Sequence, residues 1–482
     1  MVSSMYTEAE TAERIGREAY SYRFVYRAFA PLLQRWGSTS EVTRPESRLD
    51  YALWRARQQN LEPAHLSFLP LHLVYLTQQA PNIAFPFWEF PNIPDKSFGN
   101  NPRNNWLRIA DRLALILTAS SFTRDAFVRA GVKSPIHVVP VPVASRYFEV
   151  PSWERGQRTT LQTPCYLFPQ PEMPPAPAPS PWARESSAGL SLRALLLQGY
   201  KSAIKPRLPA RLDRYVGVAA GVVRGVRAAR AEDVRACVPA LPELELAGVV
   251  YTSILNPFDP RKNWQDLLSA YLLALGDCED ATLVVKLVVC PELAVPALNG
   301  IVGHYRGMNL AHRCKLVFIT KYLSDADMAE LVRGSTYYVN SARAEGSCLP
   351  LQDFLAAGRP GLAPTHTAMA DYFDDKLGFP IGSHPEPASW PHAAGEGYTT
   401  TWQRIVWQSL HDQFRHSYQV AKQDQSYYQA LASNGRGRMM EFAGAENVWP
   451  KLAAALDSIQ PEKGAHQSLL QNAWSSPIRQ AS

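Results

Sequence analysis

Short apolar runs alternate with amphipathic stretches through most of this 482-residue chain, and this alternation constrains the fold more than any other feature. Early in the chain, an amphipathic stretch at residues 24–36 precedes apolar runs at residues 64–69 and 113–119. A second series begins at Leu246, with apolar runs at residues 247–255, 282–289, 315–319 and 336–340. Strands regularly separated by helices form a parallel sheet with helices on both faces. The sequence therefore predicts an α/β fold.

Helix boundaries are well marked in the second series. Ser324 and Asp327 have the spacing of a capping box at a helix start. Gly358, followed by Pro360, should end the helix that begins at Leu351.

The last ninety residues show no strand pattern. An apolar residue recurs there every four positions, at Trp402, Val406, Leu410, Phe414 and Tyr418. This spacing predicts one long helix whose apolar stripe packs against another part of the molecule.

The chain is too long for one ordinary domain, because single hydrophobic cores stop growing near about 250 to 300 residues. It has 39 prolines, and those between residues 164 and 181 are too closely spaced for a helix or a sheet interior. We expect α/β domains at residues 1–150 and 246–385, a Pro-rich and basic insertion or linker at 151–245, and C-terminal helices at 386–482 that pack back on the first domain.

The six cysteines are widely spaced and form no CxxC pair, which favours a reducing cytoplasm over a disulfide scaffold. The first residues are acidic where a secretory signal would be basic and then apolar, and no run of 18 apolar residues occurs. We therefore expect a cytoplasmic protein that neither crosses a membrane nor is exported by this route.

The segment AEGSCLPLQDFLAAGRP, residues 344–360, follows an apolar strand and leads into a helix. A strand-to-helix junction of small residues leaves backbone N–H groups unpaired, and the helix dipole there favours an anion such as a diphosphate. Glu345 and Asp353 flank the junction, eight positions apart. They could both face a crevice at the strand ends, one toward sugar hydroxyls and the other toward a ribose. The alternative is a helix cap and a solvated helix residue.

At this point the sequence resembles the family 4 retaining glycosyltransferases of the GT-B fold, whose donor site carries two acidic residues eight positions apart around a Gly-x-x-Leu-Pro turn. Glu345, Gly346, Leu349 and Pro350 match that pattern, and Asp353 stands where the family usually has a second glutamate. The resemblance implies two Rossmann-like domains facing a central crevice, with the acceptor side in the first and the nucleotide-sugar side in the second. It also implies that Gly346, Ser347, Cys348 and Leu349 line the donor site.

A second matching segment, TSILNPFDPRKNWQDLLSAY, opens the first helix of the second series. Arg261 and Lys262 are unfavourable for the dipole of a helix start, so a bound anion would explain them. In the family a basic residue at the position of Lys262 reaches the donor diphosphate. The arginine that often precedes it by six residues is replaced by Asn256, and Lys286, inside an apolar run, could supply the missing charge. The alternative for Arg261 is an ordinary surface residue.

The first half is also similar to the family. Residues 116–143 look like its strand, serine turn, helix and closing strand, and FWEFPNIP, residues 87–94, resembles an acceptor-side segment. Trp88 and Glu89 are therefore candidate acceptor contacts. His65 and His72 are candidates for an imidazole near the donor sugar or the acceptor, and the alternative for each is a hydrogen-bonded core residue. The glycine-rich loop that usually opens the first domain is not recognisable.

The resemblance implies a retaining hexosyltransferase of polysaccharide biosynthesis that transfers a sugar from a nucleotide diphosphate to a glycan or lipid-linked acceptor. No covalent intermediate is needed, because the leaving phosphate can take the acceptor's proton. Glu345, Lys262 and Arg261 are the expected catalytic residues. Two alternatives remain open: a nucleotide-sugar epimerase of the same fold, and an inactive subunit that only binds nucleotide sugar.

No metal or other cofactor is expected. Asp325 and Asp327 have the form of a DxD metal motif, but they coincide with the capping box, and carboxylates are favoured in a first helical turn. We therefore assign them a structural role.

The formal charge of +6 comes from residues 201–235, which carry nine Lys or Arg against three Asp or Glu. Basic residues among small apolar ones could hold the enzyme at an anionic inner membrane surface. A solvated face or a linker is the alternative. Nucleic acid is not an expected partner, because Tyr215 is the only aromatic residue in the segment.

Overall fold

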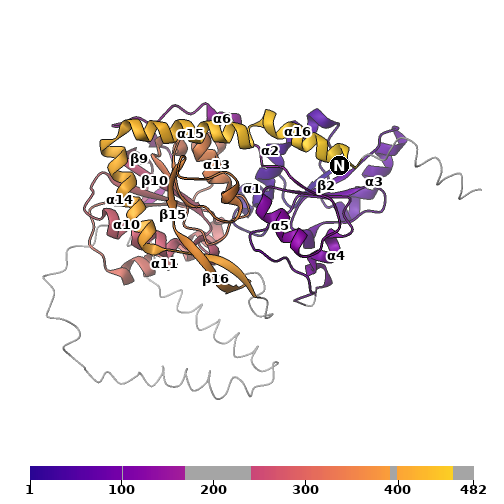
Figure 1. The fold of residues 1–482 in the computed structure, drawn as a ribbon, viewed down its shortest axis with the longest axis horizontal. Coiled ribbons are helices and arrows are strands. Elements are labelled where there is room, and N and C mark those ends of the chain that lie inside the picture. The colour runs from indigo at the N-terminus through magenta and orange to yellow at the C-terminus, as the bar shows by residue number, and fades with distance from the viewer. Residues whose placement is uncertain (100, 169–239, 391–398, 460–482) are drawn as a thin grey trace, which may run out of the picture.

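The computed structural model describes residues 1–99, 101–168, 240–390 and 399–459. Figure 1 shows two lobes side by side, each built around one sheet with helices on both faces. We refer to them as the N-terminal lobe, which contains β1–β5, and the C-terminal lobe, which contains the eight-stranded sheet. The α/β class expected from the apolar alternation is therefore confirmed.

The N-terminal lobe has a five-stranded parallel sheet in the order β1-β2-β3-β4-β5. Its strands are short, and their apolar residues pack against α2, with Phe29, Phe68 and Phe85 stacked at the centre. The strands are Val2–Ser4 (β1), His65–Phe68 (β2), Asn82–Ala84 (β3), Leu115–Thr118 (β4) and Ile136–Val138 (β5). The helices are Thr11–Arg14 (α1), Ser21–Trp36 (α2), Pro45–Gln58 (α3), Trp106–Ala110 (α4), Ser121–Arg129 (α5) and Ser145–Phe148 (α6).

The C-terminal lobe has the strand order β15-β14-β13-β10-β11-β12-β7-β8, and its six strands from β15 to β12 are parallel. Every residue of β11 is buried, which explains why this strand is a continuous apolar run. The parallel strands are Val249–Leu255 (β10), Ala281–Leu287 (β11), Lys315–Ile319 (β12), Tyr337–Val339 (β13), Gly361–Pro364 (β14) and Gly378–Ile381 (β15). The helices between them are Trp264–Leu275 (α10), Pro291–Met308 (α11), Asp325–Gly334 (α12) and Leu349–Ala356 (α13).

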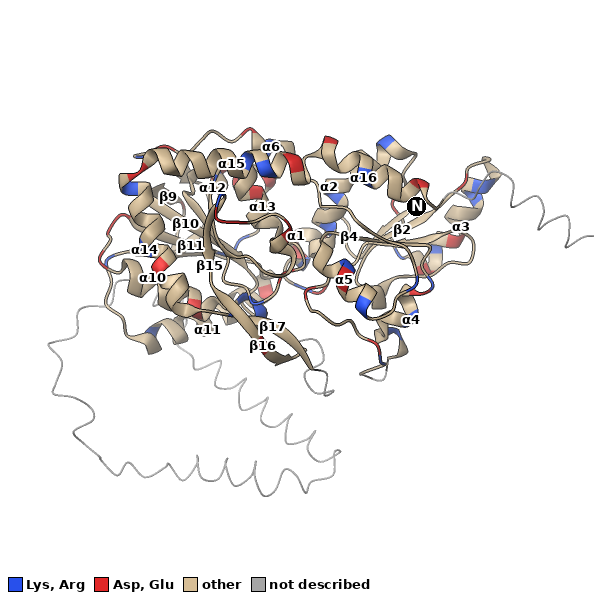
Figure 2. Cartoon of the chain, in the orientation of Figure 1, with Lys and Arg blue, Asp and Glu red and all other residues tan. Residues whose placement is uncertain are grey.

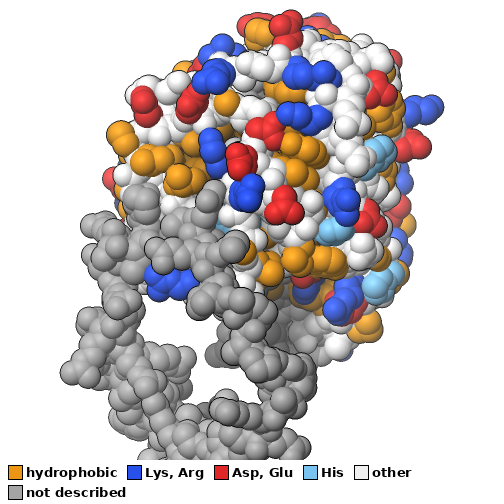
Figure 3. Space-filling model, turned by 90° about the vertical axis from the view of Figure 1, so that its left-hand side faces the viewer, with side chains coloured by type: hydrophobic (Ala, Val, Ile, Leu, Met, Phe, Trp, Pro, Cys, Tyr) orange, Lys and Arg blue, Asp and Glu red, His pale blue; other side chains and the backbone are white. Residues whose placement is uncertain are grey.

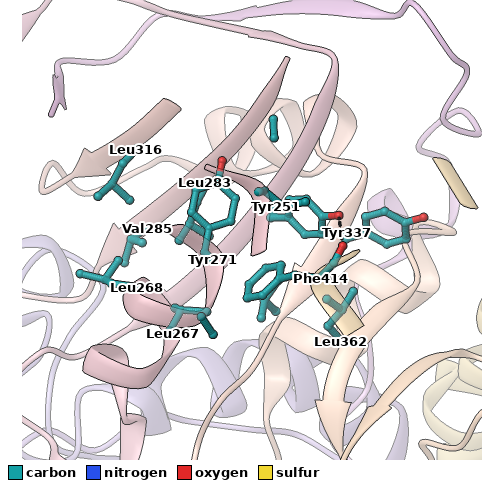
Figure 4. Close-up of a cluster of buried hydrophobic side chains, with 14 of the residues drawn as sticks. Tyr251, Leu267, Leu268, Tyr271, Leu283, Val285, Leu316, Tyr337, Leu362 and Phe414 are labelled. Carbon is teal, nitrogen blue, oxygen red and sulfur yellow. Dashed lines mark hydrogen bonds between the residues drawn. The ribbon is translucent and has the colours of Figure 1, made fainter. Parts of the chain in front are cut away.

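The core of the C-terminal lobe is rich in tyrosine (Figure 4). Tyr251 stacks on Tyr337, and Phe414 from a later helix meets Tyr251 edge-on. The buried hydroxyl of Tyr251 lies 3.0 Å from the hydroxyl of Ser417, so the polar end of the ring is satisfied inside the core. The predicted capping box of Ser324 and Asp327 is confirmed at the start of α12.

The expected insertion at residues 151–245 is wrong at both of its ends, because strands of the C-terminal lobe begin and end there. Arg158–Leu161 (β6) pairs with Leu244–Ala247 (β9), and Cys165–Leu167 (β7) joins β12 in antiparallel orientation. Ala240–Leu241 (β8) then pairs with β7. These strands are short and lie next to prolines, so their local pattern did not distinguish them from a linker. The remaining part of the insertion, residues 169–239, lies outside the described residues, as does the basic segment 201–235.

The prediction that the last ninety residues contain no strand is also wrong. Thr399–Ile405 (β17) lies in that stretch and pairs in antiparallel orientation with Ser383–Ser389 (β16), just before it. Trp402 lies opposite Glu386 and donates its indole N–H to that carboxylate. Two prolines in β16 are compatible with a two-stranded sheet, because such strands have an unpaired edge. The apolar period of four therefore belongs to a helix only from Leu410 onward.

Three helices complete the chain: Trp407–Gln423 (α14), Gln425–Ala443 (α15) and Ala445–Asp457 (α16). Leu410 and Phe414 of α14 are part of the C-terminal core, whereas Val448 and Leu452 of α16 pack with the core of the N-terminal lobe. Figure 1 shows α15 and α16 running along one side of both lobes. The tail therefore joins the two lobes.

Charged side chains also join the lobes. α2, which carries several basic residues in Figure 2, lies close to the C-terminal lobe, and Arg27 of α2 forms an ion pair with Asp325 of α12. Asp371 accepts a hydrogen bond from the backbone N–H of Ser121 at the start of α5, at 2.7 Å. On the face shown in Figure 3, basic and acidic side chains are intermixed, as expected if the excess charge lies elsewhere in the sequence.

Candidate functional site

Two loops at the carboxyl ends of neighbouring parallel strands bring the predicted catalytic residues together. The loop after β10 contains Lys262, in a short 3-10 helix Pro260–Lys262 (η6), and the loop after β13 contains Glu345. β10 pairs directly with β13, so these loops share one edge of the sheet. The Nζ of Lys262 donates to Oε1 of Glu345 at 2.6 Å, and both side chains are largely buried. Residues 83 positions apart in sequence thus form one ion pair.

Arg261 is held by two carboxylates, one from each lobe. Its Nε and Nη2 donate to both oxygens of Asp259, at 3.0 and 2.6 Å. Its Nη1 lies 2.5 Å from Oε1 of Glu89, which follows β3 in the N-terminal lobe. The surface-residue alternative for Arg261 is therefore wrong, because this side chain is buried between the lobes.

These ion pairs keep the buried cations charged. Burial alone would lower the pKa of Arg261, but Glu89 and Asp259 outweigh it and raise the pKa above its usual value. The same holds for Lys262, where burial lowers the pKa and Glu345 raises it by more. Both side chains are therefore positively charged at any physiological pH.

The junction between β13 and α13 is tightly folded around Glu345. Cys348, at the N-cap of α13, has a left-handed backbone with φ of 58°, and the hydroxyl of Tyr372 donates to the carbonyl of Ser347. A Cβ on Gly346 would lie 3.3 Å from the Cβ of Phe87 in the N-terminal lobe, so a glycine allows the lobes to approach closely here. Leu349 packs against the core of the N-terminal lobe.

Asp353 lies on α13, one turn and a half from the junction, beside α6. Burial raises the pKa of its carboxyl to about 8, and Arg146 on α6 lowers the pKa by less. This carboxyl is therefore mostly protonated at pH 7. The predicted ribose contact of Asp353 stays a prediction.

Asn256, which replaces the family's arginine, bridges the lobes. Its Nδ2 donates to the carbonyl of Gly16 at 3.1 Å. Lys286 lies one strand further, near the end of β11, and only 2% of it is exposed. Its Nζ donates to the carbonyl of Leu287 at 2.6 Å, and burial lowers its pKa to about 7. The structure does not bring Lys286 to the ion pairs of Arg261 and Lys262, so its diphosphate contact stays a prediction.

The structure argues against His65 and Trp88 as acceptor contacts. His65 is fully buried at the amino end of β2, opposite the crevice edge, and its ring nitrogens lie within 2.9 Å of Ser3 Oγ and 3.4 Å of Asn82 Oδ1. Burial lowers the pKa of His65 to about 4, so it is a neutral core histidine. Trp88 is 4% exposed and packs among other aromatic rings. The core alternative is correct for His65, and Trp88 is a core residue as well.

His72 lies closer to the crevice than His65. It follows β2 in the 3-10 helix Leu71–Leu73 (η1), accepts a hydrogen bond from the indole of Trp106, and contacts Glu18 at 2.8 Å. Of the two histidines, only His72 lies beyond the carboxyl end of its strand.

The loop between β1 and α2 was not predicted to be part of the site, because it contains a single glycine and no glycine-rich pattern. Gly16 has φ of 79°, and a Cβ there would lie 2.3 Å from the carbonyl oxygen of Val288 beyond β11. Arg17 contacts Glu292 at the start of α11. The loop between β1 and α2 therefore contacts the C-terminal lobe beyond β11.

Two further residues at the site, Arg343 and Thr367, were not predicted from the sequence. The guanidinium of Arg343 lies over the ring of Trp402 in β17, and its backbone N–H donates to the carbonyl of Arg261. Thr367 has a left-handed backbone with φ of 50°, which is unfavourable for a β-branched residue, and its hydroxyl accepts the backbone N–H of Glu345 at 3.1 Å. Local strain of this kind at a candidate site has no signature in the sequence.

Within the described part of the chain, no group of three or more His, Cys, Asp or Glu is arranged to hold a metal ion. Five cysteines fall in this part, and all five are free thiols: Cys165, Cys278, Cys290, Cys314 and Cys348. Across the same residues, none of the helices has both the length and the hydropathy of a membrane span.

No protein-family model matches the sequence, and no curated protein matches it. Solved structures do share its architecture. The sucrose-phosphate synthase of Thermosynechococcus elongatus aligns with a TM-score of 0.51 and 11% identity, covering 95% of this chain and 98% of that one. The fold is of the GT-B type.

Two other solved structures align with 95% of this chain over 98% of their own length, with lower TM-scores. A glycosyltransferase of Rickettsia africae aligns with a TM-score of 0.49 and 10% identity. Anabaena HepE in complex with UDP and glucose aligns with a TM-score of 0.47 and 13% identity. The two parallel sheets of the structure, together with its GT-B fold, confirm the expected arrangement of two Rossmann-like lobes around a crevice. Ligands bind such sheets at the carboxyl ends of their strands.

Proposed function

We propose that the protein is a glycosyltransferase that moves a sugar from a nucleotide-diphosphate sugar to a hydroxyl of a glycan or lipid-linked acceptor, with retention of configuration. The observation that carries the proposal is the pair of Lys262 and Glu345 at the carboxyl edge of the C-terminal sheet. The two groups lie 2.6 Å apart at the edge of the sheet that faces the crevice. The buried carboxylate of Glu345 can accept a hydrogen bond from a sugar hydroxyl, and the buried cation of Lys262 can bind a phosphate.

The proposed reaction uses the donor's own phosphate. The bond between the anomeric carbon and the diphosphate breaks, a bond from the acceptor oxygen forms on the same face, and the acceptor proton passes to the leaving phosphate. Lys262 stabilises the charge that develops on the diphosphate, together with backbone N–H groups between Ser347 and Leu349. Glu345 accepts hydrogen bonds from the sugar and orients it. The scheme uses no covalent enzyme intermediate and no metal.

Nucleotide release from a panel of UDP-, GDP- and ADP-sugars tests the proposal, with and without a mixture of glycan acceptors. We expect release from one nucleotide class, and faster release when an acceptor is present. Conversion of the sugar without release would instead indicate the epimerase alternative. Binding of a nucleoside diphosphate with neither reaction would indicate an inactive binding subunit.

Asp353 gives a pH-dependent prediction. A carboxylate can accept hydrogen bonds from both ribose hydroxyls, but this carboxyl, with a pKa of about 8, is neutral well below pH 8. We expect Asp353→Asn to weaken nucleoside diphosphate binding about tenfold at pH 9 and much less at pH 6, as measured by titration calorimetry. Asp412→Asn, on the exposed part of α14, serves as the control. An equal loss of affinity at both pH values would argue against the ribose contact.

Peripheral attachment to an anionic membrane through residues 201–235, and a cytoplasmic location, stay predictions. That segment lies outside the described residues.

A further inference from the structure

The two cations at the crevice already have carboxylate partners. Arg261 and Lys262 form ion pairs with the carboxylates of Asp259, Glu89 and Glu345. With all five groups ionised, the cluster carries one net negative charge. An incoming diphosphate is itself an anion, so it competes with these carboxylates for Arg261 and Lys262.

Of the two partners of Arg261, Asp259 is fixed in place. It lies two residues before Arg261, and its Oδ1 also accepts the backbone N–H of Arg261 at 3.0 Å, which caps the 3-10 helix η6. Moving this carboxylate would break three hydrogen bonds and open the helix start.

Glu89, in contrast, belongs to the opposite lobe. Its carboxylate reaches Arg261 from the loop after β3, across the line where the lobes meet. A small change in the distance between the lobes would separate Glu89 from Arg261 and leave the pair of Arg261 and Asp259 intact. The side of the guanidinium that Glu89 covers is therefore the side that can become free.

We propose that Glu89 is an internal competitor of the donor: in the donor-free protein it occupies the side of Arg261 that the donor's diphosphate takes on binding. This inference rests on the proposed function, because it assigns an effect on donor affinity to a residue of the acceptor lobe. Glu89 is a positioning residue in this scheme, since it acts on the donor through Arg261. The energy needed to separate Glu89 from Arg261 lowers the affinity for the donor.

The test is titration calorimetry of UDP, GDP and ADP into the wild-type protein and into Glu89→Gln. We expect Glu89→Gln to bind the preferred nucleotide about tenfold more tightly, because the competing charge is lost. Removing an ordinary structural contact would weaken binding or leave it unchanged, so the direction of the effect is diagnostic. Glu89→Asp keeps the charge but shortens the side chain, and it should give a smaller gain in affinity.

Glu41→Gln is the matched control. Glu41 also lies in the N-terminal lobe and forms an ion pair of 2.5 Å, with Arg23 instead of Arg261. We expect its nucleotide affinity to equal that of the wild type.

Tighter binding by Glu89→Gln, including binding where the wild type shows none, supports the inference. Equal or weaker binding by the folded variant overturns the inference and leaves the proposed function standing. Binding of no nucleotide by wild type and variants overturns both.

Discussion

Replacing Lys262 by alanine is expected to reduce the rate of sugar transfer by about 100- to 1,000-fold, the usual cost of removing one group that stabilises charge in a transition state. The loss should appear mainly in kcat, because negative charge grows on the diphosphate as its bond to the sugar breaks. Donor affinity should fall less. Both quantities come from the dependence of the initial rate on donor concentration.

The alanine variant also leaves the buried carboxylate of Glu345 without its cation, which can cost about 3 to 5 kcal/mol of stability. Lys262→Gln removes the charge but can still donate a hydrogen bond to Glu345, so it separates the effect on the reaction from the effect on folding. Lys422→Ala is the matched control, because Lys422 on α14 has an ion pair of the same 2.6 Å length with Asp280. A folded Lys262→Gln variant with wild-type turnover would end the assignment of Lys262 to the diphosphate.

Replacing Lys286 by methionine is expected to stabilise the protein. Burial lowers the pKa of Lys286 to about 7, whereas an unfolded lysine has a pKa of about 10.4, so the folded protein holds this proton less tightly than the unfolded chain. Below pH 7 Lys286 is charged in both the folded and the unfolded state, so the cost of burying the ammonium lowers the stability of the wild type by its full amount. The stability should increase between pH 7 and about pH 10, where the folded protein has lost this proton and the unfolded chain still holds it. The gain from methionine should be on the order of 3 to 5 kcal/mol at pH 6 and much smaller at pH 10.

Denaturant unfolding of wild type and Lys286→Met at pH 6 and pH 10 measures this difference. Lys315→Met serves as a control, because Lys315 begins the neighbouring strand β12 and is exposed. A variant that is less stable than the wild type at pH 6 would show that the ammonium is well accommodated in the folded protein. The same variant tests the predicted donor contact, since a lysine that binds diphosphate should also cost donor affinity when it is removed.

Ion pairs explain why the predicted cations at the crevice are present but already have partners. Lys262 is paired with Glu345, and Arg261 with Asp259 and Glu89, so both of these cations already have a carboxylate partner. Pairing reduces the cost of burying these charges. It also means that donor binding requires an exchange of partners, which is the basis of the test on Glu89.

The sequence alone determined the α/β class and much of the second sheet. The apolar runs predicted for β10, β11, β12 and β13 lie within a few residues of the observed strands, because a strand buried on both faces needs apolar residues at nearly every position. The junction around Glu345 was also readable, since the strand, the small residues and the helix that follow are consecutive in the chain. Buried strands and strand-to-helix junctions can be predicted from the sequence because they are determined by residues that are neighbours in the chain.

Only the tertiary structure decided which side chains meet. Glu89 reaches Arg261 and Gly16 reaches Val288 from another lobe, and nothing in their own neighbourhoods in the sequence encodes those contacts. His65 and His72 have similar local surroundings in the sequence, but one lies at the amino end of β2 and the other beyond its carboxyl end. The hairpin of β16 and β17 was missed because each strand is specified by its partner rather than by its own apolar period. Contacts between distant segments depend on how whole lobes pack, and periodicity along a single stretch of chain carries no information about that packing.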